Sequence, residues 1–355
     1  MELKNTYTVI GLMSGTSLDG LDVALCTFTK NKNKWVYKII EAKTFTYNKT
    51  WKEKLQHAHL LNAQEFCKLH VDFGKFSAQA IGQFLKGKKH KVDLIASHGQ
   101  TIFHQPHNGF TCQIGDGAAI AALTNITTAC DFRSSDVALG GQGAPLVPIG
   151  DKLLFTDYDA CLNIGGISNI SFIHKKQRLA FDICPANLVF NFYANKAGMP
   201  YDKGGKLAAK GKINQTLLKK LNALSFYKNL KSKSLGREWI DEKVISPLEG
   251  ESISLNDKLA TAVEHSAFQT ARVLNHFNTK NVLITGGGAY NKYFIERIQS
   301  YITCKLVLPD DKTIQFKEAL IFAFLGVLRL RNEVNCLKQV TGASKNSCGG
   351  ALYNI

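Results

Sequence analysis

Apolar and polar positions at the start of the chain form two apolar runs on either side of a glycine-containing polar turn. Residues 6–11 are β-branched and apolar, and residues 21–28 are apolar again. Apolar runs around such a turn are typical of a β-hairpin. Apolar positions alternate over residues 35–47, which predicts a third strand.

Residues 62–85 have the periodicity of a helix. Their apolar side chains recur at steps of three and four, and Asn62 precedes them as a capping residue. A buried strand is predicted at 92–96, ending in Ser-His-Gly-Gln-Thr at 97–101. A glycine-led turn into a helix follows at 115–123, and another strand at 126–130.

The first pattern recurs after a loop at 140–145. Strands are predicted at 160–164, 169–173 and 179–183, with a glycine turn between the first two; a helix at 187–197, a strand at 281–284 and a helix at 316–330 follow. Two glycine-turn hairpins, one opening each half, indicate a duplicated α/β unit with a ligand cleft between its copies. We expect a first domain over 1–150, joined by residues from about 319 to 355, and a second over 151–318.

Composition agrees with a folded chain of two domains. The chain has 355 residues, 45% of them hydrophobic and 20% charged. No apolar run is long enough to span a membrane, and the first residues do not resemble a signal peptide. We therefore expect a cytoplasmic protein.

The nine cysteines contain no Cys-x-x-Cys pair, which favours buried reduced thiols over disulfides or zinc.

The net charge of +16 raises the question of nucleic-acid binding. The lysines are spread along the chain, and no aromatic–basic motif accompanies them. Short basic clusters are more often solvated loops. We expect no nucleic-acid partner and no membrane; attraction of an anionic substrate is a milder use of the charge.

The turn at 11–22 has the composition of a phosphate-binding hairpin. Gly15 and Gly20 allow backbone N–H groups to approach oxygen, and Thr16 and Ser17 add hydroxyl donors. Asp19 can hold magnesium through water. An ordinary hairpin turn explains the same residues, and no Walker A lysine follows.

Two further glycine sites are weaker signals. Gly165 and Gly166 form the second hairpin turn, and Gly286, Gly287 and Gly288 follow a buried strand. A surface without side chains at a strand's carboxyl end suits a nucleoside or phosphate. Tight turns of the backbone are the alternative for both.

A few side chains are candidates for chemistry. Asp182 ends a predicted strand and is placed for general-base work, although turn aspartates are common. Arg133 follows a strand beside the glycine-rich loop and can bind a carboxylate or phosphate, unless it forms a surface ion pair. His98 and His104 have no triad or metal spacing, so we treat them as structural or substrate-lining.

Together these motifs resemble the anhydro-N-acetylmuramic acid kinase family. The segments that carry the resemblance stand in the family's order along almost the whole chain: Gly-Leu-Met-Ser-Gly-Thr-Ser-Leu-Asp-Gly-Leu-Asp at 11–22, Ser-His-Gly-Gln-Thr at 97–101, Gln-Ile-Gly-Asp at 113–116, Asp-Phe-Arg at 131–133, Gly-Gly-Gln-Gly-Ala-Pro-Leu-Val-Pro at 140–148, Asn-Ile-Gly-Gly at 163–166 and Thr-Gly-Gly-Gly at 285–288.

The resemblance implies a hexokinase/actin-like (ribonuclease H-like) α/β fold of two duplicated lobes, with ATP and magnesium between them. It implies that water opens 1,6-anhydro-N-acetylmuramic acid while O6 receives the γ-phosphate, giving N-acetylmuramic acid 6-phosphate in peptidoglycan recycling. Asp182 aligns with the family's catalytic base, and Thr101, Arg133 and Glu318 with sugar-binding residues. The family often forms homodimers. The implied ATP-binding residues are Gly15, Thr16, Ser17, Leu18, Asp19, Gly20, Leu21, Asp22, Gly165, Gly166, Gly286, Gly287 and Gly288.

The chain departs from the family after the catalytic aspartate. The family's usual Asp-Thr-Gly-Pro-Gly-Asn is replaced by Asp-Ile-Cys-Pro-Ala-Asn at 182–187. The change leaves two alternatives open: a kinase for another amino sugar such as N-acetylglucosamine, and a nucleotide-binding sensor without catalysis. Nucleic-acid binding by charge alone is a separate alternative, raised by the net charge.

Overall fold

The computed structural model describes residues 4–32, 34–230 and 233–355. Contacts between Cα atoms divide the chain into two compact units. The first consists of Met1–Leu154 with Phe316–Ile355, and the second of Phe155–Gln315. Both ends of the chain therefore belong to the first unit, and its limits lie a few residues from the boundaries predicted at 150 and 319.

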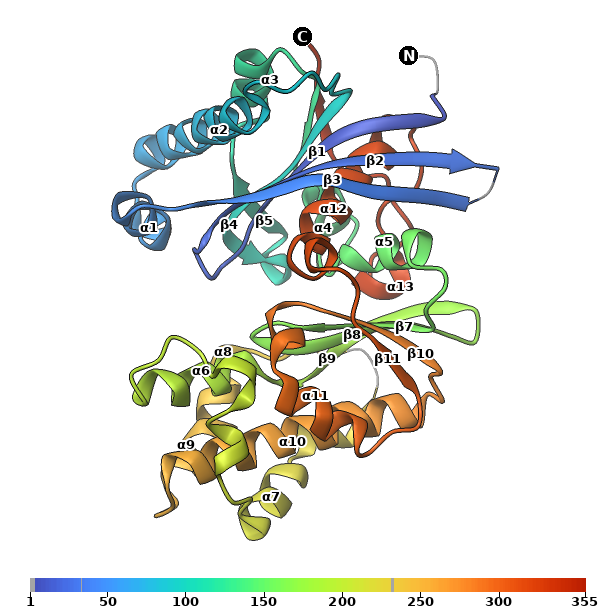
Figure 1. The fold of residues 1–355 in the computed structure, drawn as a ribbon. Helices are drawn as coiled ribbons and strands as arrows, with labels where there is room; N and C mark the ends of the chain where they lie inside the picture. Colours follow the sequence, from blue (N-terminus) through green and yellow to red (C-terminus); the bar gives the residue numbers. More distant parts are fainter. Residues whose placement is uncertain (1–3, 33, 231–232) are drawn as a thin grey trace. The chain divides into compact units, whose positions relative to one another are not determined.

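The first unit contains a sheet of mixed strand direction (Figure 1). β1, β2 and β3 form an antiparallel meander, and β4 and β6 run parallel to β1 on its other side. The strands in sheet order are β12 (Ala351–Tyr353), β6 (Thr128–Cys130), β4 (Leu94–Gln105), β1 (Thr6–Ser14), β2 (Gly20–Asn31) and β3 (Lys34–Thr46), with β5 (Phe110–Ile114) paired to β4.

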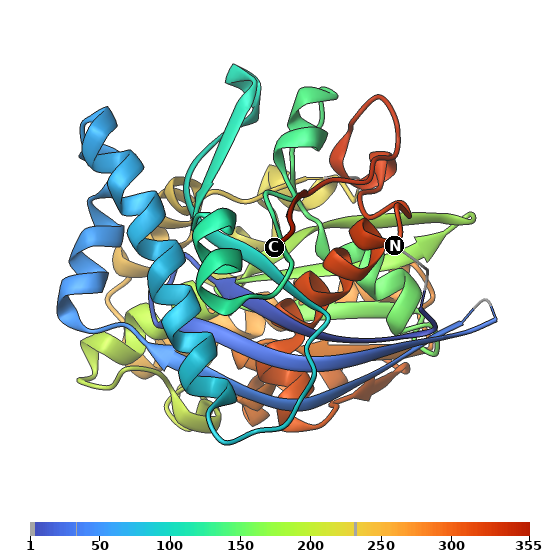
Figure 2. The same cartoon turned by 90° about the horizontal axis from the view of Figure 1, so that it is seen from above.

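Helix α2 (Ala63–Leu85) confirms the predicted helical periodicity. It begins with a capping box, in which Asn62 Oδ1 accepts the Glu65 amide at 3.0 Å. Its buried side chains, Leu69 and Phe73 among them, share a core with Leu12 of β1. Figure 2 shows α2 lying across the blue strands of this sheet.

Helix α12 (Asp311–Leu330) begins before the predicted residue 316 and changes direction at Phe316, whose φ and ψ are −114° and 16°. Gly11 of β1 meets this helix so closely that a Cβ would collide with the carbonyl oxygen of Ala319. Phe324 of α12 packs against Phe28 of β2, with ring centroids 5.3 Å apart. The glycine therefore permits contact between the strand and the helix backbone.

The second unit repeats the strand order of the first. β7, β8 and β9 form an antiparallel meander, and β10 and β11 run parallel to β7. This repetition confirms the predicted duplicated fold of ribonuclease H-like type; the cleft expected between the lobes stays a prediction. The strands in sheet order are β11 (Lys305–Val307), β10 (Asn281–Thr285), β7 (Ala160–Ile164), β8 (Ile167–His174) and β9 (Gln177–Pro185).

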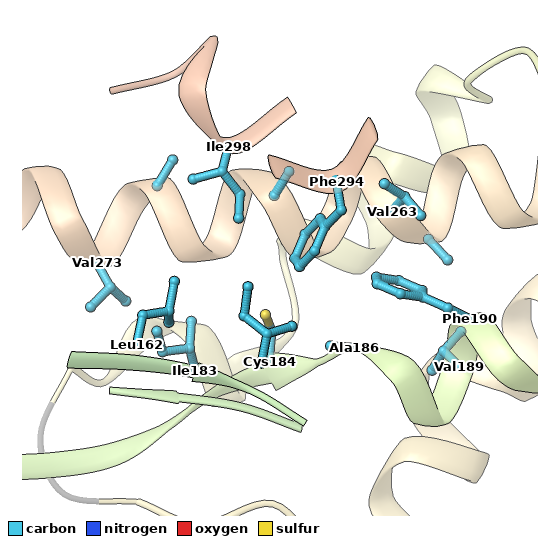
Figure 3. Packing of buried hydrophobic residues seen from close by; sticks show 14 of the residues in the cluster. Leu162, Ile183, Cys184, Ala186, Val189, Phe190, Val263, Val273, Phe294 and Ile298 are labelled. Atoms are coloured by element: carbon cyan, nitrogen blue, oxygen red, sulfur yellow. The ribbon is translucent and has the colours of Figure 1, made fainter. Parts of the chain in front are cut away.

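One face of the second sheet is covered by α10 (Leu255–His276) and α11 (Lys292–Gln299), as Figure 3 shows. Leu162 and Ile183 lie on the sheet side of this core, and Phe294 descends from α11. Phe294 contacts Phe190 of α6 (Asn187–Lys196) with ring centroids 5.2 Å apart. The interior joins strands and helices that are far apart in the sequence.

Two sequence expectations need correction. β4 does not end at 96 but continues through 97–101 to Gln105, because β5 pairs with its second half. β9 continues beyond residue 183 to Pro185, so Asp182 lies within the strand.

In the part of the chain that the structure describes, none of the helices has the length and apolar character needed to span a membrane.

The other α-helices are shorter. In the first unit they are α1 (Lys49–Gln56), α3 (Gly117–Thr124), α4 (Ser134–Ala138), α5 (Val147–Leu154) and α13 (Lys338–Thr341). In the second they are α7 (Gln215–Asn222), α8 (Arg237–Ile240) and α9 (Ser246–Glu249).

Candidate active site

The first glycine turn, residues 15–19, joins β1 to β2. The Leu18 amide donates to the Gly15 carbonyl at 3.3 Å, and Leu18 has a positive φ of 56°. Thr16, Ser17 and Asp19 are exposed, and the amides of Thr16 and Ser17 have no backbone acceptor in the described part of the chain. The turn therefore offers N–H and hydroxyl donors, as phosphate oxygens require.

A buried hydrogen-bond chain lies behind this turn. Ser14 Oγ is within hydrogen-bond distance of both Gln100 Oε1 and Tyr47 Oη, the latter at 2.6 Å. The amide oxygen of Gln100 only accepts, so Ser14 donates to it and Tyr47 donates to Ser14. These residues fix the end of β1 to β4 and to Tyr47, which directly follows β3. No local sequence pattern marks these residues, because their partners are far apart along the chain.

At the end of the predicted ATP-binding segment, Gly20 and Leu21 contribute to packing, and Asp22 supplies a charged group. A Cβ on Gly20 would lie 2.6 Å from the Phe45 carbonyl oxygen, and Leu21 is buried in the core. Asp22 is half-buried and accepts a hydrogen bond from Thr44 Oγ1 at 2.6 Å. Burial raises the pKa of its carboxyl, although the Thr44 hydrogen bond opposes the shift.

Arg133, just before α4, is held by two neighbours in the first unit. Its Nε and Nη2 donate to His98 Nε2 at 3.1 and 2.8 Å, and its Nη1 donates to the Gly143 carbonyl at 2.6 Å. Burial lowers the pKa of Arg133 to about 10, while the charge of Glu318 acts in the opposite direction. Arg133 is therefore an oriented cation, and not the surface ion pair considered as its alternative.

Glu318 of α12 and Thr101 of β4 are the other predicted sugar-binding residues. The pKa of the Glu318 carboxyl is raised because surrounding protein removes hydration, an effect that Arg133 counteracts and Asp22 strengthens. Glu318 is nevertheless solvent-accessible. Thr101 Oγ1 is 3.4 Å from its donor, Gln113 Nε2. The first unit thus couples Arg133, Glu318 and Asp22 through their charges.

In the second unit, the turn at Gly165 and Gly166 docks onto the start of α6. The Gly165 carbonyl accepts the Asn187 amide at 3.2 Å, and the Gly166 carbonyl accepts the amides of Ala186 and Leu188 at 2.9 and 3.1 Å. A Cβ on Gly166 would lie 2.9 Å from Leu188 Cγ. The second glycine turn therefore fixes the segment that follows Asp182.

Asp182 lies in β9 at an irregularity of the pairing with β8, where Ile183 is the additional residue. Its amide donates to the Lys233 carbonyl at 3.0 Å, and its Oδ2 accepts the Leu235 amide at 2.9 Å. Burial raises the pKa of its carboxyl, opposed by the Leu235 hydrogen bond and the charge of Lys233. The half-buried carboxylate is thus fixed through one oxygen and suited to accept a proton.

The third glycine site follows β10 and lies against β7. Gly286 has a φ of +83°, and a Cβ there would lie 2.7 Å from Asn163 Oδ1. A Cβ on Gly288 would collide with Ile164. Both glycines are therefore required for close packing of backbone on the strand.

Gly287 lines a cavity of about 710 Å³ in the second unit. The cavity's wall combines aromatic, amide and basic side chains, as a site for a nucleoside or phosphate does. Thr285 Oγ1, directly before the glycines, is buried without a hydrogen-bond partner among the described residues. The full lining is Asn187, Phe190, Asn191, Tyr201, Asp202, Lys203, Gly204, Lys206, Gly287, Tyr290, Asn291 and Lys292.

The residues that depart from the family pattern lie in the interior of the second unit. Ile183, Cys184 and Ala186 are each at most 1% exposed, and Figure 3 shows them facing the core beneath α10 and α11. Ala186 has a φ of −138° and a ψ of −106°, so its φ lies outside the left-handed region that favours glycine. Cys184 Sγ lies 3.5 Å from the Ser266 carbonyl oxygen. The replacements fill the core behind Asp182.

The described part of the chain holds no group of three or more His, Cys, Asp or Glu side chains that could bind a metal ion directly. Magnesium keeps much of its hydration and is often held by one or two carboxylates together with phosphates. The exposed carboxylate of Asp19 beside the first turn fits this mode.

The repeated sheet and its glycine turns define a two-lobed protein of the ribonuclease H-like class. The family model of anhydro-N-acetylmuramic acid kinase matches residues 7–355. The chain is 34% identical to the anhydro-N-acetylmuramic acid kinase of Hydrogenovibrio crunogenus, with 97% of each chain covered, and 33% identical to that of Vibrio vulnificus, with 100% of each covered. The chain belongs to the anhydro-N-acetylmuramic acid kinase family.

Solved structures are similar at a greater distance. The activator of 2-hydroxyisocaproyl-CoA dehydratase from Clostridium difficile with bound ADPNP has a TM-score of 0.45 at 12% identity, with 91% of this chain and 96% of that chain covered. A ROK family glucokinase from Streptomyces griseus in complex with glucose and AMPPNP has a TM-score of 0.38 at 9% identity, with 90% and 99% covered.

Proposed function

We propose that this chain is an ATP-dependent kinase that hydrolytically opens 1,6-anhydro-N-acetylmuramic acid and phosphorylates O6, giving N-acetylmuramic acid 6-phosphate. Water forms a bond to the anomeric carbon as that carbon's bond to O6 breaks, and O6 receives the γ-phosphoryl group as ADP leaves. The reaction belongs to the recycling of peptidoglycan sugars. Family membership over the full length supports the proposal.

The observation that carries the chemistry is the setting of Asp182. Its Oδ2 accepts the Leu235 amide, whereas its Oδ1 has no hydrogen bond in the described residues. A carboxylate fixed in this way has one oxygen free to take the proton of the attacking water. Arg133 and Glu318, which interact through their charges, would contact the sugar, with Thr101 as a further polar contact.

ATP supplies the phosphoryl group, and the chain's glycine sites would hold it. The open N–H groups of the 15–19 turn suit the phosphates, and the cavity beside Gly287 suits the nucleoside. Asp19 would hold magnesium through water, which neutralises charge on the phosphates. Use of ATP supports action in the cytoplasm. Sedimentation analysis would test whether the chain forms the homodimer expected from the family.

Mass analysis of the product tests this proposal. Incubation with the anhydro sugar, ATP and magnesium in ¹⁸O-labelled water is expected to give one labelled oxygen at the anomeric carbon and none in the phosphate. A kinase for N-acetylglucosamine would instead consume ATP with that sugar, and competition between the two sugars separates these cases. A nucleotide sensor would show no sugar-dependent ADP release.

A further inference from the structure

The guanidinium of Arg133 is fixed on two sides by groups within the first unit. Two of its nitrogens, Nε and Nη2, donate to the same atom, His98 Nε2, and Nη1 donates to the Gly143 carbonyl. A guanidinium has five N–H donors. One N–H on each terminal nitrogen therefore remains for an anionic or hydroxyl group of a ligand.

These contacts select one form of the His98 ring. Arg133 only donates hydrogen bonds, so His98 Nε2 must carry a lone pair and no proton. His98 Nδ1 lies 2.8 Å from the Gly99 carbonyl oxygen, which only accepts, so Nδ1 carries the hydrogen. The structure thus requires the neutral Nδ1–H tautomer.

The surroundings of His98 favour this neutral ring. The residue is 6% exposed, and its ring packs on Phe322 with centroids 4.6 Å apart. Burial, followed by the positive charge of Arg133, lowers the pKa of His98 to about 3. The imidazole therefore stays an acceptor at any pH near neutrality.

The other group that fixes Arg133, the Gly143 carbonyl, is also held in place. The Gly143 amide donates to Oδ2 of the buried Asp136 at 2.8 Å, and Asp136 Oδ1 accepts the Thr341 hydroxyl at 2.8 Å. Gly143 has a φ of +65°, and a Cβ there would lie 2.8 Å from Val137 Cγ2. The carbonyl that accepts from Arg133 is therefore fixed from the α4 side.

We propose that His98 is a positioning residue for the sugar, because its unprotonated Nε2 aims the Arg133 guanidinium so that its two free N–H groups meet the substrate. The inference rests on the proposed function in that Arg133 is taken to contact the sugar. His98 acts through Arg133, by geometry and not by proton transfer.

The first test replaces the acceptor while keeping a ring of similar size. His98→Phe is expected to raise KM for the anhydro sugar about 10- to 100-fold, since loss of alignment at an oriented contact costs this order of magnitude. KM for ATP should stay within about twofold. His98→Gln, which restores an acceptor oxygen, should recover most of the lost kcat/KM.

His265→Phe is the matched control. His265 is likewise buried and makes two side-chain hydrogen bonds, to Asn222 at 2.8 Å and Tyr227 at 2.9 Å, but it lies in the second unit. Its replacement should lower stability without changing KM for the sugar. If His98→Phe behaves like this control while the wild type phosphorylates the anhydro sugar, the positioning role is wrong and the proposed function stands.

A double-mutant cycle tests whether His98 acts through Arg133. In an Arg133→Ala background, His98→Phe should change kcat/KM by less than about twofold, because its target is already absent. Additive losses in the double variant would overturn the inference. A wild-type enzyme without any turnover of the anhydro sugar would instead contradict the proposed function.

Nitrogen NMR of the ligand-free, full-length enzyme gives a readout independent of turnover. With ¹⁵N-labelled histidine, the His98 signals are expected to show Nδ1–H and an unprotonated Nε2 unchanged from about pH 5.5 to pH 8.5, a range around the ordinary histidine pKa. Titration near the ordinary value, or a proton on Nε2, would overturn the arrangement even if every variant were too unstable for kinetics.

Discussion

The backbone amide of Leu235 donates a 2.9 Å hydrogen bond to Oδ2 of Asp182, although 53 positions separate the two residues. The neighbouring Lys233 carbonyl accepts the Asp182 amide at 3.0 Å. The segment 233–235 thus holds both the backbone and the carboxylate of the proposed base, and the consequences can be measured.

Replacement of Asp182 with Asn should abolish proton acceptance while keeping an oxygen for the Leu235 amide. We expect kcat to fall about 10²- to 10⁴-fold, the usual contribution of a general base, with ATP binding little changed. Asp159→Asn is the matched control, because Asp159 Oδ2 also accepts backbone amides, those of Lys280 and Asn281, at 2.8 and 3.0 Å. Near-normal turnover of the Asp182 variant would refute the base assignment.

The pH profile should report the raised pKa of Asp182. The base must be ionised, so kcat/KM should fall as pH drops through a pKa above the ordinary aspartate value. The charge of Lys233 lowers this pKa, and Lys233→Met should therefore move the acid limb to higher pH. The exposed Lys228→Met serves as control and should leave the limb in place.

Replacement of Asp182 with Asn should raise the stability of the fold, although it lowers activity. The folded-state pKa of Asp182 is raised, so ionisation disfavours folding, and this cost is complete only above the folded pKa. Asp182→Asn should then have a higher Tm than wild type near pH 7. The difference should shrink as pH falls through the folded pKa and vanish below the unfolded one; a constant difference would contradict burial as the cause.

Substitutions at the adjacent residues Gly287 and Gly288 should affect different properties, nucleotide binding at the first and folding at the second. Gly288→Ala would press a Cβ into Ile164 and should cost about 1–3 kcal/mol of stability, as overpacking does. A Cβ at Gly287 meets only Asn187 Nδ2, at 4.0 Å, so Gly287→Ala should fold normally but raise KM for ATP. Thermal unfolding and ATP titrations of both variants check this; equal effects on stability would contradict it.

Much of the fold could be predicted from local pattern. The capping residue and spacing of α2 were readable, as were the hairpins that open each unit. Helix α10 has no amphipathic pattern that would mark it in the sequence, although Ser254 caps it, because it is buried around most of its circumference and lacks a polar stripe. The second half of β4 depends on pairing with β5, which a single strand's sequence does not reveal.

The candidate site was predictable where glycine or a catalytic carboxylate marked it. The hydrogen bonds that hold the site in place were not predictable, because they join residues that are distant in the sequence: Ser14 with Gln100, and Arg133 with His98. The sequence alone indicates only a structural or substrate-lining role for His98. A buried histidine beside an arginine becomes informative only when the direction of each donor is known.

The family departure at 183–186 gives a further prediction. Cys184 is buried in the second core, so Cys184→Gly should lower stability by about 1–3 kcal/mol through loss of packing. It should not increase turnover, because the side chain faces away from the site into the core. A marked gain in kcat or a switch in preferred amino sugar would show that this segment controls catalysis.

The fate of solvent oxygen tests hydrolytic opening by Asp182 most directly. In ¹⁸O-labelled water, with the anhydro sugar and ATP present, we expect a 6-phosphorylated product that carries one label at the anomeric carbon, and loss of this product in Asp182→Asn. A phosphorylated sugar without solvent oxygen at that carbon would contradict hydrolytic opening by Asp182.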